Sequence, residues 1–346
     1  MGKRKYIISI GIMAVLFIVT YYMVFRRYSP ALLLDVIGDV NLRFVAAAVC
    51  CIICYVVCDA LCIKTSMGAV QGKMPFFKAL QYTAVGIYFA SITPSSSGGQ
   101  PAQIYYMARE GNEVSNSAIS LMLMSVIFKF VLLTAGLPVV FLEARYVFFG
   151  LPHFKGLFIL GIFLISGMMF LLLFAMFSKK LIYRMVKFFV GLLARLKILK
   201  HPENTMKKLL LQVEGYHRAA DLLRRSPGLL VKIYLITLVQ RTAMFSVAYF
   251  VYKAFGLSGL SWIDIVAIQI GLSISVDSLP LPGAIGVSEG VFLGLYASVY
   301  GRLLLVPAMV LTRFCGFYLP LAISGITTAA LHLKLTFKKP KTGDSK

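Results

Sequence analysis

Acidic residues, histidine and tryptophan are scarce in this chain. Among its 346 residues there are 13 Asp and Glu, four His and one Trp. Catalytic metal sites and acid–base sites are usually built from clustered histidines and carboxylates, and the sequence contains no such cluster. We therefore expect no metal, no cofactor and no catalytic residue. A membrane-bound transferase acting on a lipid phosphate is the enzymatic alternative.

Cysteine is present but in no recognisable ligand pattern. Four of the six cysteines, Cys50, Cys54, Cys58 and Cys62, recur every four residues and so lie along one helix face. No histidine lies near a C-x-x-C pair in the sequence, as a zinc site of that type would require. We interpret the stripe as small apolar side chains packed against a neighbouring helix rather than as a metal or redox site.

The chain also lacks a polar stretch that would form a separate soluble domain. The longest polar stretch, residues 178–228, is about 50 residues long and has a helical composition. Hydrophobic residues make up 59% of the chain, compared with roughly 45–50% in soluble domains. Several apolar runs reach the length of about 18 residues that a membrane-spanning helix needs. We therefore predict one all-α, polytopic integral membrane domain over residues 1–346.

Six apolar segments are long enough to be full spans. They cover approximately residues 6–25, 44–63, 117–141, 155–177, 229–252 and 303–331. The first follows three basic residues, as a signal peptide would. However, Arg26 and Arg27 stand where a small-residue cleavage site would be required, so we predict a retained helix.

Two further apolar segments are interrupted by proline, glycine and serine. The interruptions are SITPSSSGGQP (Ser91–Pro101) and SLPLPGAIGVSEG (Ser278–Gly290). Proline removes a backbone donor and glycine relaxes the backbone, so neither segment can be one continuous helix. Backbone groups freed inside hydrocarbon need partners from protein or water. Paired breaks in the two halves of a chain predict a binding site near the membrane midplane.

The distribution of Lys and Arg predicts how the interrupted segments sit in the membrane. If each is a re-entrant hairpin that enters and leaves on one side, 25 basic residues fall inside and seven outside. If the first segment crossed instead, the 13 basic residues of 178–232 would lie outside. We therefore predict about six full spans plus two opposed re-entrant hairpins in an inverted repeat. Both termini would be cytoplasmic, and the protein would lie in the cell membrane.

The formal net charge of +22 could indicate a protein that binds nucleic acid. Most of this charge lies between apolar segments, where it sets topology and attracts anionic lipid. Basic side chains in residues 178–228 alternate with apolar ones such as Phe188 and Leu192. We predict helices that lie along the inner leaflet, with a solvated cytoplasmic linker as the alternative. The expected partner is the bilayer and not nucleic acid.

Three basic residues lie too deep in predicted spans to reach water. Lys129 and Arg241 are 12 residues inside and Arg313 is ten residues inside, and 12 residues of helix measure roughly 18 Å. Each costs roughly 2.5–3.5 kcal/mol to insert. Only Asp277 and Glu289 lie near the second break, so pairing leaves an expected surplus of one positive charge. Such a surplus suits a phosphate, whereas internal pairing alone is the structural alternative.

The two interrupted loops offer further groups for an anion. The first supplies serine hydroxyls, glycines that allow close approach and glutamine amides, and Pro101 predicts a helix start with free N–H groups. The predicted substrate-binding residues are Lys129, Arg241, Arg313, Asp277, Glu289, Ser95, Ser96, Ser97, Gly98, Gly99, Gln100, Gln103, Pro282, Gly283 and Gly286.

Both breaks resemble signature motifs of the lysylphosphatidylglycerol synthase transmembrane-region family. The stretch TPSSSGGQPAQIYY is similar to its T-P-[SG]-x-x-G-G-Q-P motif, and LPLPGAIGVSEG is similar to its P-x-P-G-x-[IL]-G-x-x-E motif. The resemblance extends over essentially the whole chain. The best-known member of this family is multiple peptide resistance factor. The resemblance implies that the corresponding domain of that protein flips aminoacylated phosphatidylglycerol, which a separate C-terminal domain makes. We expect no such synthetase domain here.

The resemblance implies a flippase for an anionic or aminoacylated phospholipid, such as lysylphosphatidylglycerol, linked to resistance to cationic antimicrobial peptides. One alternative is the membrane part of a phosphatidylglycerol lysyltransferase system that serves a separate soluble synthetase. Another is a transporter of polyisoprenyl phosphate or glycolipid. The sequence leaves the oligomeric state open between a monomer and a homodimer.

Overall fold

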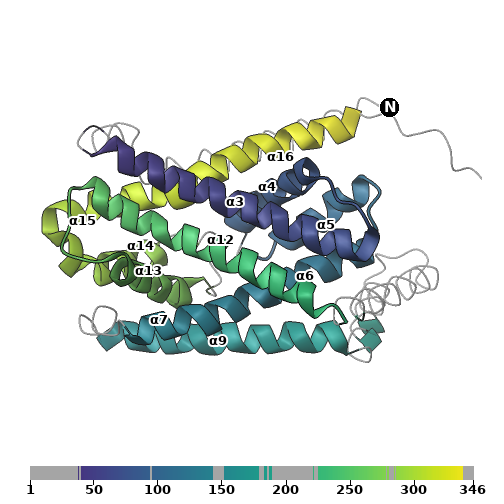
Figure 1. Ribbon diagram of the computed structural model, residues 1–346, viewed down its shortest axis with the longest axis horizontal. Helices are drawn as coiled ribbons and strands as arrows, with labels where there is room; N and C mark the ends of the chain where they lie inside the picture. The colour runs from purple at the N-terminus through teal and green to yellow at the C-terminus, as the bar shows by residue number, and fades with distance from the viewer. Residues whose placement is uncertain are drawn as a thin grey trace, which may run out of the picture.

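The computed structural model describes residues 38, 40–93, 96–142, 152–178, 183–184, 187–188, 221, 225–277, 279, 284 and 286–337. Within these residues every regular element is a helix (Figure 1). The predicted first span near residues 6–25 and most of the basic segment 178–228 lie outside the described residues.

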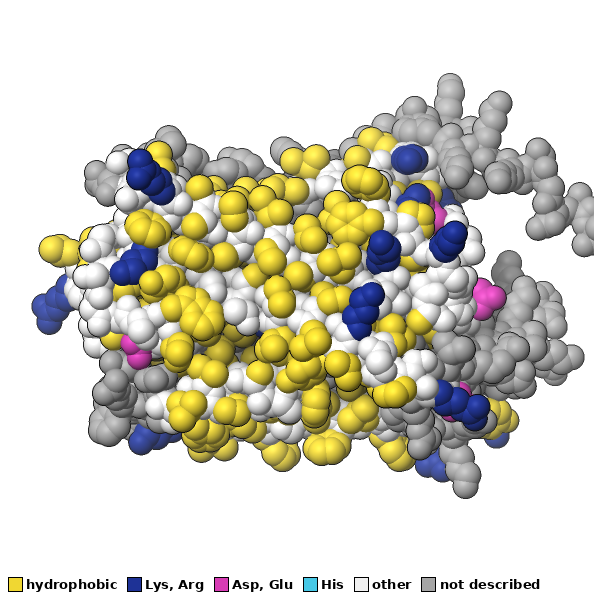
Figure 2. All heavy atoms as spheres, viewed as in Figure 1, with side chains coloured by type: hydrophobic (Ala, Val, Ile, Leu, Met, Phe, Trp, Pro, Cys, Tyr) yellow, Lys and Arg dark blue, Asp and Glu magenta, His cyan; other side chains and the backbone are white. Residues whose placement is uncertain are grey.

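Five helical segments are long and apolar enough to cross a membrane. They are α3 (Leu42–Gln71), α6 to α7 (Val114–Leu142), Lys155–Phe174 of α9 (Pro152–Phe177), α12 (Pro227–Ala254), and Ala297–Thr336 of α15 to α16. Their outward side chains include large hydrophobics such as Phe163, Phe170 and Ile326. Figure 2 shows hydrophobic side chains across the middle of the molecule, with Lys and Arg toward its two ends. The chain is a multi-pass membrane protein of the predicted all-α class.

Helices α3 and α12 pack along each other (Figure 1), and the buried hydrophobic side chains of the described residues form several groups. The largest group joins α12 to the elements that follow it and includes Phe245, Ile268 and Leu311. A second group joins α3 to the elements that follow it, with Met67 and Met107 at 0% exposure. Each group also contains residues from the other half of the chain, such as Ile52 of α3 in the first and Leu331 in the second, so each interrupted segment packs against helices from both halves.

The first interrupted segment is a pair of antiparallel helices, α4 (Phe76–Ile92) and α5 (Gly99–Arg109). A side chain on Gly99 would meet the Gly86 carbonyl oxygen at 2.9 Å, so glycine is required for this close approach. At the other end Lys78 pairs with Glu110. The two outer ends of the pair therefore lie together. The 11 residues of α5 measure only about 16 Å, roughly half the hydrocarbon thickness.

The predicted first break is confirmed, with one correction. Helix α4 ends at Ile92 and α5 begins at Gly99, so Pro101 lies inside the first turn rather than at the helix start. Proline is tolerated in a first turn because the N–H groups there have no intrahelical acceptor. The Gly98 N–H donates a hydrogen bond to Thr93 Oγ1 at 2.8 Å, which links the start of α5 to the end of α4.

The second interrupted segment repeats this arrangement with α13 (Trp262–Val276) and α14 (Val287–Leu295). The Tyr296 hydroxyl, just beyond α14, lies 3.4 Å from the Ile265 carbonyl oxygen in the first turn of α13, so the outer ends of the two helices lie near each other. The arm that follows the second break is the nine-residue helix α14. The helix stops at Tyr296, and the following α15 (Ala297–Arg313) is kinked at Gly301, whose φ of 63° favours glycine.

The two helix pairs lie toward opposite ends of the molecule. In Figure 1 the α4–α5 pair lies toward the right and the α13–α14 pair toward the left. Each pair is followed by a long helix that contains a π-helical turn. These turns are η1 (Leu132–Gly136) between α6 (Val114–Val131) and α7 (Leu137–Leu142), and η2 (Phe314–Tyr318) between α15 and α16 (Leu319–Phe337).

Candidate functional site

Arg313 is held in a direct ion pair. Its Nε and Nη2 both lie 3.1 Å from Glu289 Oε1. Glu289 is only 4% exposed, and its carboxylate also accepts the backbone N–H of Gly286, which closes the first turn of α14. Gly286 has a φ of 93°, which favours glycine. This ion pair therefore fixes α14, the short helix of the second helix pair, to α15. The Glu289 carboxylate also neutralises the charge of Arg313.

Arg241 on α12 has a different environment. Its guanidinium carbon lies 3.8 Å from the centre of the Phe128 ring and 5.2 Å from that of Tyr55. Its Nε is buried and has no hydrogen-bond partner among the described residues. In the described part of the chain, the ion pairs within 4.0 Å do not include Arg241. Aromatic faces therefore position this guanidinium without using its donors on a carboxylate.

Asp277 lies where the three deep bases meet. It follows the last residue of α13, remains exposed, and accepts a hydrogen bond from Ser273. Its carboxylate interacts electrostatically with all three bases, Arg241 first, then Lys129 and Arg313. Lys129 on α6 is partly buried and interacts with both Asp277 and Arg241. The structure thus brings these four predicted residues, together with Glu289, to one region beside the second break.

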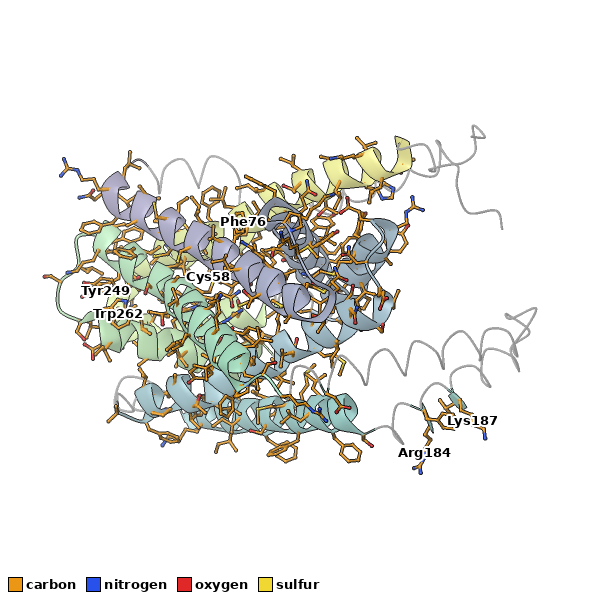
Figure 3. All side chains as sticks on the ribbon, turned by 45° about the vertical axis from the view of Figure 1, so that its right-hand side comes forward. Cys58, Phe76, Arg184, Lys187, Tyr249 and Trp262 are labelled. Atoms are coloured by element: carbon orange, nitrogen blue, oxygen red, sulfur yellow. The ribbon has the colours of Figure 1, made fainter. Side chains whose placement is uncertain are left out.

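Sequence reasoning missed Asp59. This acid is the eighteenth of the 30 residues of α3 and therefore lies near its middle. In Figure 3 the labelled Cys58, its neighbour, marks the position. Asp59 Oδ2 accepts a hydrogen bond from Thr83 Oγ1 at 2.8 Å and Oδ1 accepts one from Gln240 Nε2 at 2.9 Å. It also interacts electrostatically with Arg241.

The expected surplus of one positive charge does not hold. Because the predicted span ended at residue 63, Asp59 stood close to its apparent end, whereas α3 continues to Gln71. Asp59, Asp277 and Glu289 therefore balance the three bases in number. The signal that could have found Asp59 is the same as for the bases, an ionisable residue inside an apolar run.

The two predicted glutamines of the first hairpin bind protein groups. Gln100 donates to the Leu121 carbonyl at 3.1 Å and to Ser125, while Gln103 donates to the Tyr82 carbonyl at 3.0 Å. They fasten α5 to α6 and α4. Ser125 is four residues before Lys129, so the start of α5 lies about one helical turn from that base.

The remaining predicted loop residues differ in placement. Ser96 and Ser97 are exposed, and Ser96 has a φ of 55°, which is uncommon for a residue other than glycine. Gly98 and Gly99 form the start of α5. Three predicted residues, Ser95, Pro282 and Gly283, lie outside the described residues.

Both halves place a base next to a π-helical turn. Lys129 precedes η1 by three residues, and Arg313 directly precedes η2. Each base also lies on the helix that receives the first turn of a short arm, through Gln100 in one half and Glu289 in the other. π-helical turns inside α-helices are frequent at functional sites. The repeated arrangement marks this region as the candidate site.

Comparison with known proteins agrees with the motifs. A family model described as the lysylphosphatidylglycerol synthase TM region matches residues 6–324. A UPF0104 membrane protein from Archaeoglobus fulgidus is 25% identical over 306 residues, which cover 86% of this chain and 87% of that protein. No solved structure matches the chain. The family match includes both interrupted segments and all six charged residues of the candidate site.

Proposed function

Because this chain belongs to the lysylphosphatidylglycerol synthase transmembrane-region family, we propose that it is a flippase for an anionic or aminoacylated phospholipid such as lysylphosphatidylglycerol. The headgroup would pass between the two hairpins while the acyl chains stay in the bilayer. An aminoacylated lipid in the outer leaflet lowers the negative surface charge that attracts cationic peptides. Resistance to cationic antimicrobial peptides would follow from that change.

The observation that carries the proposal is the state of Arg241. A guanidinium offers five donors in a planar fork that matches the oxygens of a phosphate. The ion pairs among the described residues leave Arg241 out, and its buried Nε lacks a partner there. A buried polar group without a partner is costly, so a ligand that supplies oxygen atoms would be stabilised at this position. Lys129 would add a second positive charge to the phosphate.

The membrane arrangement that fits this role has two opposed re-entrant hairpins in an inverted repeat of about six spans. Its support is threefold: short arms in both pairs, outer ends that lie together, and positions at opposite ends of the molecule (Figure 1). In this arrangement both termini are cytoplasmic and the site lies between the hairpin tips. The π-helical turns would give α6 and α15 a place to shift as the headgroup passes.

Liposomes containing the purified protein provide the test. Tail-labelled phosphatidylglycerol, lysylphosphatidylglycerol and polyisoprenyl phosphate share a phosphate and differ in the rest of the molecule, so comparing them distinguishes the alternative substrates. We expect at least one to exchange between leaflets without chemical change, and Arg241→Gln to abolish that exchange. Arg302→Gln, which removes an exposed charge, is the matched control.

Two results would contradict the proposal. Exchange that does not depend on Arg241 would rule out the phosphate site. The formation of a new lipid by the protein, in place of exchange, would favour a transferase. A soluble synthetase that restores exchange only when added would instead support the membrane part of a lysyltransferase system.

A further inference from the structure

Asp59 connects three helices through one carboxylate. It lies on α3, its partner Thr83 lies on α4 of the first hairpin, and its partner Gln240 lies on α12. Thr83 is 0% exposed and Gln240 is 3% exposed, so water does not compete for these bonds. The carboxylate therefore has a fixed position relative to Arg241, the next residue after Gln240.

The carboxylate is close enough to act on Arg241 but does not bind it. Each of its oxygens accepts a bond from a neutral donor, 2.8 Å from Thr83 and 2.9 Å from Gln240. No ion pair within 4.0 Å joins Asp59 to Arg241, although the two charges interact electrostatically. This contrasts with Glu289, which contacts Arg313 directly. No carboxylate therefore occupies the donors of the guanidinium, while an opposite charge stays nearby.

From this geometry we propose that Asp59 is a positioning residue that limits how tightly Arg241 holds an anionic headgroup. This inference rests on the proposed function. A phosphate bound at Arg241 brings a second negative charge toward Asp59, and like charges in a medium of low dielectric repel each other. The fixed carboxylate therefore weakens the bound state and speeds release of the lipid. A site without this charge would bind more tightly and turn over more slowly.

The decisive variant is Asp59→Asn, because it removes the charge while preserving the connections. The new amide oxygen can accept from Thr83, and its NH2 group can donate to Gln240 if the Gln240 amide flips. We expect the dissociation constant for phosphatidylglycerol to fall about tenfold, the effect of a modest charge–charge interaction. The apparent KM and the maximal rate of leaflet exchange should fall together.

Two control variants separate charge from structure. Thr83→Val breaks one connection but keeps the Asp59 charge, so it should lower thermal stability without tightening binding. Asp264→Asn removes the charge of another buried carboxylate, which caps α13 through Ser261. It should likewise affect stability and leave the affinity for phosphatidylglycerol unchanged. A purely structural role of Asp59 would make Asp59→Asn behave like these controls.

The measurements are lipid binding by native mass spectrometry and leaflet exchange in phosphatidylglycerol vesicles. If Asp59→Asn does not fold, Asp59→Ser serves as a second neutral variant with the same expected result. Weaker binding, or affinity and rate both within twofold of wild type, would overturn the role of Asp59 while leaving the flippase intact. A wild-type protein that neither binds nor moves any of the labelled lipids would overturn both proposals.

Discussion

Arg313 and Arg241 each have a carboxylate nearby, but only Arg313 contacts its carboxylate directly. Arg313 contacts Glu289 at 3.1 Å, and that carboxylate also closes the first turn of α14. Arg241 lies against the Phe128 and Tyr55 rings, while the nearby Asp59 is bonded to neutral donors. A closed pair holds a hairpin in place, whereas an open guanidinium can hold a ligand. Contact geometry, rather than charge alone, therefore separates a structural base from a candidate binding base.

Breaking the closed pair should produce the largest loss of stability. Glu289→Gln removes the carboxylate that contacts the partly buried Arg313 and weakens the α14 cap, for an expected loss of about 3–5 kcal/mol. Thermal unfolding in detergent measures the effect. The double variant Glu289→Gln with Arg313→Gln should recover part of the loss, because the two changes remove one interaction. Strictly additive losses would show that the pair is not coupled.

Changing the open base should affect transport far more than stability. Arg241→Lys keeps the charge but loses the planar fork, so we expect partial exchange activity, roughly tenfold below wild type. The unfolding temperature should stay within a few degrees, since no carboxylate loses a contact. Arg313→Lys is the matched variant in the closed pair and should instead lower stability. Equal behaviour of the two lysine variants would remove the distinction between the sites.

The ends of the two hairpins should be accessible from opposite sides of the membrane. In a cysteine-free background, single cysteines at Lys73 and Arg109 flank the first hairpin, and those at Lys253 and Arg302 flank the second. The first two should react only from the cytoplasm and the other two only from outside. Impermeant thiol reagents applied to cells and to inverted vesicles measure this. If Lys73 and Arg109 react from opposite sides, the first segment is a full span.

A smaller effect is expected at the outer end of the first hairpin. Burial alone would raise the pKa of Glu110, but hydrogen bonds from Lys78 and Tyr82 hold that pKa below its ordinary value of 4.5. A depressed folded-state pKa contributes stability above the ordinary value, and this contribution is lost as pH falls below it. Between pH 6 and pH 3 wild type should lose about 1 kcal/mol more than Glu110→Gln. Parallel pH profiles would contradict the assignment.

Much of the helical framework could be predicted because it depends on local rules. Proline, glycine and serine inside apolar runs located both breaks, and hydropathy located the five described spans. Helix ends were less accessible, since a helix can extend beyond its apolar run, as α3 does from residue 63 to Gln71. That difference concealed Asp59. The kink at Gly301 likewise follows from a backbone conformation that composition does not reveal.

The candidate site was predicted as a set of residue types but not as a set of contacts. The three deep bases were identified by their insertion cost, which needs only the sequence. Which base is paired depends on tertiary packing, and only the structure separates Arg313 from Arg241. Gln100 and Gln103 show the same limit, because their amides suit an anion equally well but bind Leu121, Ser125 and Tyr82.

The central claim is that Arg241, rather than Arg313, receives the phosphate of the transported lipid. A density map of the protein in phosphatidylglycerol nanodiscs tests this most directly. The account predicts a headgroup between the hairpin tips, with phosphate oxygens within hydrogen-bond distance of the Arg241 guanidinium and the Glu289–Arg313 pair intact. A phosphate seated on Arg313 with that pair broken, or a site in which Arg241 is bonded to Asp59 and no lipid enters, would contradict it.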